Sequence, residues 1–194
     1  MRAAVGIKAW IAKIPCVEEV RPTHCAGCGA ASRPVGSGVV LHGHGLLLRQ
    51  VRGVLALGER PGVFALWVRR YACQVCNAVM TVVPSGMLAR RQYSGPSIAL
   101  ALHLWLMAGL SDRAVRAQVC AWQVRGRSGR GWAQLYRWAS RAATLFALPR
   151  AVSESGDRHD VARRVLTTLR ALAPAAVSCV PIEHQIFEGA ALTR

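Results

Sequence analysis

Acidic residues are scarce in this sequence, and lysine is almost absent. Nine Asp and Glu residues stand against 25 Lys and Arg residues in 194, so the formal net charge is +16. Only Lys8 and Lys13 are lysines, and arginine carries the rest of the positive charge. A bias in base composition explains arginine in place of lysine, but it does not explain the shortage of acids. The balance predicts a polyanionic partner, and because arginine binds phosphate and guanine edges bidentately, nucleic acid is favoured over membrane headgroups.

Long apolar runs are also missing. The longest apolar stretch, residues 98–110, is too short to span a bilayer and contains His103. The first residues show neither an uninterrupted apolar run nor a cleavage site, so no signal peptide is expected. We therefore predict a soluble, cytoplasmic, nucleoid-associated protein with no membrane partner. In that compartment paired cysteines are metal ligands rather than disulfides.

Patterns of common catalytic sites are absent as well. No glycine-rich phosphate loop precedes a predicted helix, and Ser85 and Ser128, each followed by glycine, lack the context of a nucleophile elbow. Cys120 and His103 would form a nucleophile pair only if two predicted helices brought them together, which the sequence does not require. The sequence therefore indicates no catalytic residue, and a non-enzymatic function is favoured.

Two cysteine pairs organise what is present. Cys25 and Cys28 form one C-x-x-C motif, and Cys73 and Cys76 form a second. Each spacing lets two thiolates turn toward one ion, and two such pairs supply the four sulfurs of a closed tetrahedral zinc site. One pair alone would also fit a redox motif, but two in one segment predict structural Zn²⁺ held by these four residues. The gap between the pairs is longer than that of common zinc ribbons, which fits extra strands between them.

The other cysteines and the nearby histidines have alternative roles. Cys16, Cys120 and Cys179 are expected to be free, partly buried thiols. His42 and His44 share one face of a predicted strand, and His24 adjoins the first cysteine pair, so each could join a metal site. Because four cysteines already complete a zinc shell, a surface position or a phosphate contact is the favoured interpretation for these histidines.

The predicted fold class is α+β, with a small antiparallel zinc-ribbon sheet followed by a helical, helix-turn-helix-like domain. Residues 1–20 are expected to be a weakly structured lead-in, with one strand near residues 9–14. Residues 21–92 form the ribbon: they contain strand-forming segments at 38–52, 63–71 and 79–83, and the last of these should end at Pro84. A sheet of this size buries little apolar surface, so zinc would supply much of its folding free energy.

Residues 93–148 show helical periodicity. Ser94 or Ser97 can cap a helix that runs to Met107, Gly109 suits a left-handed C-cap, and Ser111 can cap the next helix. Two helices joined by a short glycine-containing turn are the opening of a helix-turn-helix unit. Residues 149–194 are predicted to form a C-terminal helix and tail. That helix, residues 157–172, has an apolar stripe of Val161, Val165, Leu169 and Leu172 that is suited to core packing or to a homodimer contact. The residues after it show no clear periodicity.

A third helix, residues 132–146, is predicted to read nucleic acid. One of its faces is apolar, and another carries Gln134, Arg137 and Arg141, which suits a recognition helix in a major groove. An ordinary solvated face is the alternative. Before this helix lies a basic, glycine-rich loop whose arginines are predicted to contact phosphates: Arg125, Arg127 and Arg130.

The combined motifs resemble a known group of proteins. The first cysteine pair, the His-Gly-His-Gly segment at residues 42–45 and the strand Arg-Arg-Tyr-Ala-Cys at residues 69–73 resemble the zinc-finger heads of insertion-sequence transposases. They also resemble small uncharacterised mobile-element proteins that share a domain of unknown function. In those proteins a helix-turn-helix follows the ribbon, as residues 108–115 suggest here. The resemblance covers roughly residues 21–145 and implies double-stranded DNA as the partner.

Two departures limit that resemblance. Residues 122–131 stand where a short turn normally precedes the recognition helix. A transposase of this type would also continue into a domain that binds divalent metal through spaced carboxylates, and the remaining residues, 147–194, are too few for one. Their acids lack a strand framework: Glu154, Asp157, Asp160, Glu183 and Glu188. The sequence thus predicts a DNA-binding protein for transposon ends or transcriptional regulation. The alternatives are a remnant or accessory subunit that acts with a separate transposase chain, and a zinc-ribbon adaptor that binds protein.

Overall fold

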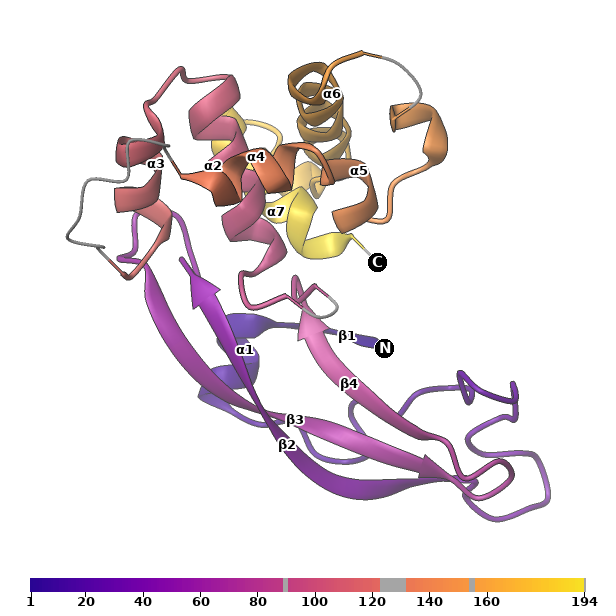
Figure 1. Cartoon of the computed structure of the whole chain (residues 1–194). Helices are drawn as coiled ribbons and strands as arrows, with labels where there is room; N and C mark the ends of the chain where they lie inside the picture. Colours follow the sequence, from indigo (N-terminus) through magenta and orange to yellow (C-terminus); the bar gives the residue numbers. More distant parts are fainter. Residues whose placement is uncertain (89–90, 123–131, 154–155, 194) are drawn as a thin grey trace. The chain divides into compact units, whose positions relative to one another are not determined.

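The computed structural model (Figure 1) describes residues 1–88, 91–122, 132–153 and 156–193. The described chain is a mixed α+β structure with a four-stranded sheet and seven α-helices. In chain order the elements, with two 3₁₀ turns (η), are β1 (Arg2–Gly6), α1 (Ile7–Ala12), β2 (Leu41–Gly53), β3 (Gly62–Cys73), β4 (Val79–Ser85), α2 (Gly95–Leu106), α3 (Asp112–Val119), α4 (Ala133–Ala139), α5 (Ala142–Leu145), η1 (Arg150–Ser153), α6 (Arg158–Ala171), η2 (Ala175–Val177) and α7 (Ile182–Leu192).

The chain divides into two compact units. The first unit, the ribbon unit, consists of Met1–Gln50 and Ala65–Ser85. The second, the helical unit, consists of Val51–Phe64 and Gly86–Arg194, so it includes the tip of the β2–β3 hairpin as well as α2 to α7. No helix in the described residues is both long enough and apolar enough to cross a membrane.

The ribbon unit is built on a sheet with strand order β1-β4-β3-β2 (Figure 1). β3 and β4 pair antiparallel, as the sequence predicts, with Arg69 opposite Val82. β1 pairs with β4 in the parallel direction, so the prediction of a purely antiparallel sheet is wrong. The sequence predicted that β4 ends at Pro84, but the strand continues to Ser85.

The N-terminal segment is ordered, which corrects the prediction of a weakly structured lead-in. Residues 7–12 form α1 and not a strand. Trp10 on this helix is fully buried, and its indole N–H donates a hydrogen bond of 2.9 Å to the carbonyl of Trp67 on β3. Tyr71, also fully buried, donates from its hydroxyl to the Val17 carbonyl at 2.6 Å. These two long-range contacts attach the N-terminal segment to the sheet.

The helical unit is centred on α2. Ser94 caps this helix, and its hydroxyl accepts a hydrogen bond of 3.2 Å from the Ser97 N–H, which confirms one of the two predicted caps. Ser97 instead has an inward role: its hydroxyl donates to the Val54 carbonyl and accepts from the Val54 N–H, both at 3.0 Å. Gly53 makes this possible, because it has φ +112° and a Cβ there would lie 2.1 Å from the Ser97 Oγ.

α3 begins as the sequence predicts, and the third predicted helix differs. Gly109 has φ +69°, and the Ser111 hydroxyl caps α3 by accepting from the Ala114 N–H at 3.3 Å. The single helix predicted for residues 132–146 is wrong, because α4 ends at Ala139 and α5 begins at Ala142. At the break the Ser140 hydroxyl donates to the Tyr136 carbonyl at 2.9 Å. A serine bonded to the preceding turn in this way often bends a helix.

The C-terminal segment supplies two core helices. α6 is capped by the Asp157 carboxylate, and it buries Ala162, Val165, Leu166 and Leu169, whereas Leu172 of the predicted stripe is 44 % exposed. α7 was not expected, yet it packs on both α2 and α6. The α6–α7 crossing is close at Gly189, where a Cβ would lie only 1.8 Å from the Leu169 carbonyl oxygen. The C-terminal segment, for which the sequence showed no clear periodicity, therefore contributes a helix to the core of the helical unit.

Candidate metal centre and candidate nucleic-acid interface

The two cysteine pairs fold into matching knuckles. In the first, the Cys25 N–H donates to the Ala30 carbonyl at 2.8 Å, and the Gly29 N–H donates to the Cys25 carbonyl at 3.0 Å. The second knuckle begins at Cys73, the last residue of β3, and has the same two hydrogen bonds. In each knuckle the N–H of the first cysteine donates to the carbonyl five residues later, and its carbonyl accepts from the N–H four residues later. Its N–H···O distances are 3.0 Å from Cys73 to Ala78 and 2.9 Å from Asn77 to Cys73.

The position after the second cysteine has a left-handed backbone in both knuckles. Gly29 has φ +74°, and Asn77 has φ +56°. Glycine and asparagine are the residues that adopt this conformation most readily. Cys28 and Cys76 directly precede them and are exposed, whereas Cys25 and Cys73 are buried. The same local geometry, formed twice, therefore presents two sulfurs from each knuckle.

The four sulfurs lie together. The sulfur atoms of Cys25 and Cys76 are 3.6 Å apart, and those of Cys28 and Cys73 are 3.8 Å apart. All four lie within 4.8 Å of one another, and the group can hold a metal ion. The separations exceed the roughly 2.05 Å of a disulfide. The separations of 3.6 and 3.8 Å are close to the edge of about 3.8 Å expected for sulfurs placed about 2.3 Å from the centre of a tetrahedron.

The electrostatics of this cluster favour a bound cation. Backbone N–H groups of Cys28 and Gly27 point at the Cys25 sulfur and lower the pKa of Cys25 to about 6. At Cys76 the Ala78 N–H favours the thiolate, but the neighbouring Cys28 sulfur, burial and the other cluster thiols outweigh it and raise the pKa of Cys76 to about 12. Four adjacent thiolates repel one another unless a cation lies between them.

The histidines stay outside this cluster. Among the described residues, the group that could hold a metal ion contains the four cysteines alone. His42 and His44 are exposed on β2, and His24 is exposed with its Nδ1 3.2 Å from the Thr23 hydroxyl. The other three cysteines, Cys16, Cys120 and Cys179, are free thiols as predicted. Cys120 is buried, but Cys16 and Cys179 are exposed, so the prediction that these two are partly buried is wrong.

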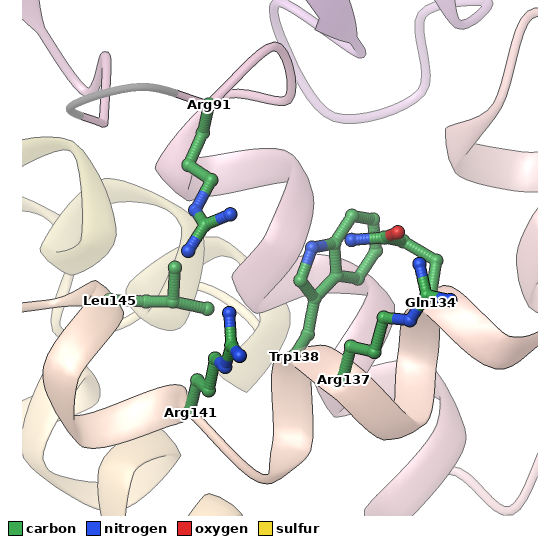
Figure 2. Close-up of a pocket in the computed structure, with 6 residues that line it drawn as sticks. All are labelled: Arg91, Gln134, Arg137, Trp138, Arg141 and Leu145. Atoms are coloured by element: carbon green, nitrogen blue, oxygen red, sulfur yellow. The ribbon is translucent and has the colours of Figure 1, made fainter.

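A basic hollow of about 350 Å³ lies in the helical unit, on the predicted recognition segment. Figure 2 shows Arg91 and Arg141 extending toward one another past Leu145, with Arg137 beside Gln134. The hollow is lined by six residues: Arg91, Gln134, Arg137, Trp138, Arg141 and Leu145. We call this feature the basic hollow.

The three residues predicted to contact the DNA groove, Gln134, Arg137 and Arg141, all line the basic hollow. Gln134 and Arg137 lie on α4, and Arg141 lies at the break before α5. Both arginines are exposed, and Gln134 is half-buried. The three predicted phosphate contacts lie outside the described residues: Arg125, Arg127 and Arg130.

Sequence reasoning missed Arg91. This arginine lies in the segment before α2, far along the chain from α4, and only the tertiary structure places it in the basic hollow. The following residues are fixed in place: the Arg52 N–H donates to the Gln92 carbonyl at 2.7 Å, and the Ser94 N–H donates to the Arg52 carbonyl at 3.2 Å. The hairpin tip therefore positions the backbone next to Arg91.

An aromatic cluster holds the inner wall of the hollow. Trp138 is 2 % exposed and meets the ring of Tyr93 edge to face at 5.0 Å between centroids. It meets Trp132 in the same way at 5.1 Å. The backbone N–H of Trp132 donates to the Asp112 carboxylate on α3 at 3.0 Å, and this hydrogen bond connects the start of α4 to α3. Edge-to-face aromatic pairs of this kind add stability beyond their buried area.

The guanidinium groups of the hollow have no described carboxylate as partner. The described ion pairs of Glu18 and Asp160 involve other arginines, and no carboxylate lines the hollow. Three arginines that line one hollow whose lining contains no carboxylate form a site for an anion.

Comparisons with known proteins found no match, whether among protein-family models, curated proteins or solved structures.

Proposed function

We propose that this chain is a non-catalytic, zinc-stabilised protein that binds double-stranded DNA through the basic hollow. The observation that carries this proposal is the convergence of three arginines and a glutamine on one surface of the helical unit. Arg137 and Arg141 are exposed there, and the whole chain carries a formal net charge of +16. Arginine and glutamine side chains are those that reach phosphates and purine edges.

Zinc is the metal we propose for the cysteine cluster. Four thiolates in a tetrahedral arrangement suit Zn²⁺, and a shell made only of protein sulfurs leaves no open position for a substrate or water. The ion would therefore have a structural role. It would join the segment before β2 to the turn between β3 and β4, and so fix the end of the sheet.

The biological role proposed for this binding is recognition of transposon ends or transcriptional regulation. A related proposal is that the chain is an accessory or remnant subunit of a transposase and acts with a separate catalytic chain. Metal-dependent strand cleavage by a co-purifying partner, and none by this chain alone, would distinguish the second role from the first.

Binding to random-sequence duplex DNA across a salt series tests the proposal. Each phosphate contact releases counterions, so the slope of log K against log salt is about −0.9 per contact. Three arginines in the hollow predict a slope of about −3 or steeper. Absence of binding at low salt would refute the DNA proposal.

A specific observation supports a protein-interaction adaptor as the second candidate. Leu46, Leu47 and Leu48 on β2 are 37 %, 37 % and 50 % exposed, and Trp67 on β3 is 47 % exposed. β2 lies at the edge of the sheet, where unpaired backbone groups can accept another strand. Protein binding that does not change with salt, together with no DNA binding, would favour the adaptor.

A further inference from the structure

We propose that the basic hollow accepts a phosphate monoester, the 5′-phosphate at a DNA strand end, in preference to an internal phosphodiester. This inference rests on the proposed function and adds the part of the DNA that the hollow recognises. It follows from three features of the site: its concave shape, the charge of its lining, and the fixed backbones that carry its arginines.

Shape is the first argument. An internal phosphate continues into a nucleotide on both sides, so it is contacted most easily by side chains that project from a ridge. The three arginines instead surround a hollow of about 350 Å³, and Arg91 and Arg141 face one another across it (Figure 2). A group at the end of a strand can enter such a hollow because the chain continues on one side only.

Charge is the second argument. A phosphodiester carries one negative charge and two free oxygens, whereas a phosphate monoester carries about −1.5 to −2 charges at pH 7 and offers three acceptor oxygens. The three guanidinium groups carry a summed charge of +3, which the monoester neutralises further than the diester does, and they can donate to each of its three free oxygens. The gain from the extra charge is greatest where no protein carboxylate competes, as in this lining.

Rigidity is the third argument. Arg137 and Arg141 flank Trp138, which is held by two edge-to-face ring contacts. Arg91 precedes a segment that the hairpin tip fixes by two backbone hydrogen bonds, one of which ends at Gln92. The backbones that carry the three arginines are thus positioned before any ligand binds, which lowers the entropic cost of binding.

The test compares short duplexes that are identical except for 5′-phosphate or 5′-hydroxyl ends, with a closed circular duplex and inorganic phosphate as further ligands. We expect about 10-fold tighter binding of the phosphorylated duplex, which corresponds to one additional charge-assisted hydrogen bond. Inorganic phosphate at millimolar concentration, added at constant ionic strength, should remove this preference, because it occupies the place of the terminal phosphate in the hollow. A free phosphate or mononucleotide that binds as tightly as the phosphorylated duplex would show that the hollow serves a small ligand, and would overturn the proposal.

Variants separate the hollow from the overall charge. Arg91→Gln and Arg141→Gln should each abolish the 5′-phosphate preference. Arg163→Gln, which removes the same charge from an exposed side chain on α6, should retain it. Arg141→Lys keeps the charge without the bidentate geometry and should lose part of the preference. Melting curves identify any variant that fails to fold. If a variant does not fold, the comparison of 5′-phosphate and 5′-hydroxyl duplexes with the unsubstituted chain decides whether the proposal holds.

A pH series gives an independent readout. The monoester gains a proton near pH 6, so its charge falls toward −1 as the pH drops from 7.5 to 5 and the preference should disappear. Circular DNA has no such group, and its binding should not follow this curve. Equal affinity for the two kinds of end at pH 7.5 would overturn this inference while leaving the DNA-binding proposal intact. Loss of all duplex binding would overturn both.

Discussion

Replacing Cys73 with serine is expected to abolish metal binding and to unfold the sheet of the ribbon unit. Cys73 is 1 % exposed and supplies one of only four sulfurs in the cluster. Structural zinc sites contribute about 10–16 kcal/mol of apparent binding free energy in small peptides, which is comparable to the whole stability of a typical domain. Bound zinc per chain should fall from about one to near zero, and amide hydrogen exchange in β3 and β4 should accelerate roughly 100-fold.

Cys16→Ser is the matched control for this prediction. Cys16 belongs to the same unit but is exposed and lies outside the cluster, so its replacement should change neither zinc content nor exchange. Amide exchange in α2 and α6 should remain slow in both variants, because these helices have their own core in the helical unit. A Cys73→Ser protein that retains a full equivalent of zinc, or keeps slow exchange in β3 and β4, would contradict the proposed metal centre.

Replacing both Arg137 and Arg141 with alanine is expected to weaken binding to duplex DNA about 100-fold, or about 10-fold for each arginine. Both side chains are exposed, and no described carboxylate holds them, so their removal should not destabilise the fold. The salt slope should become shallower by about 2, because two counterion-releasing contacts are lost. Fluorescence anisotropy at several salt concentrations measures both quantities.

The control for this pair must remove equal charge from another surface. Arg163→Ala combined with Arg170→Ala does so on α6, where Arg163 pairs with Asp160 and Arg170 donates to Gln185. We expect this control to lower the affinity by less than about 3-fold through the change in net charge alone. Equal losses in the two double variants would assign the binding to overall charge and would remove the basic hollow from the account.

The sequence predicted the features that short motifs indicate: the cysteine cluster, two helix starts and the turn between these helices. The spacing of the cysteines was enough to predict four sulfurs around one point. Ser94 and Ser111 mark two helix starts because a short hydroxyl side chain satisfies a free backbone N–H there. Gly109 marks the turn between these helices because its backbone is left-handed.

The elements that sequence reasoning missed depend on contacts between distant parts of the chain. α1 has only six residues and no side-chain cap, and the burial of Trp10 against the sheet stabilises it. α7 likewise lacks a side-chain cap and contains Gly189, which usually disfavours a helix. That glycine is required where α7 passes close to the Leu169 carbonyl, and no local pattern shows this.

The candidate site follows the same division. Gln134, Arg137 and Arg141 were predicted together because they recur at helical spacing, although a break at Ser140 separates Arg141 from the helix that carries the other two. Arg91 carries no helical or motif signal, and it reaches the hollow through tertiary packing alone. The sequence therefore predicted one basic surface, and the structure shows that this surface is a hollow.

Cross-linking of the zinc-loaded full chain to a duplex with photoreactive phosphate analogues, mapped by mass spectrometry, tests the central claim most directly. The account predicts that most cross-links fall on peptides covering residues 132–146 and on the peptide that contains Arg91. Cross-links confined to residues 41–73, the strands β2 and β3 with the hairpin between them, would contradict it. They would place the DNA contact on the hairpin in place of the basic hollow.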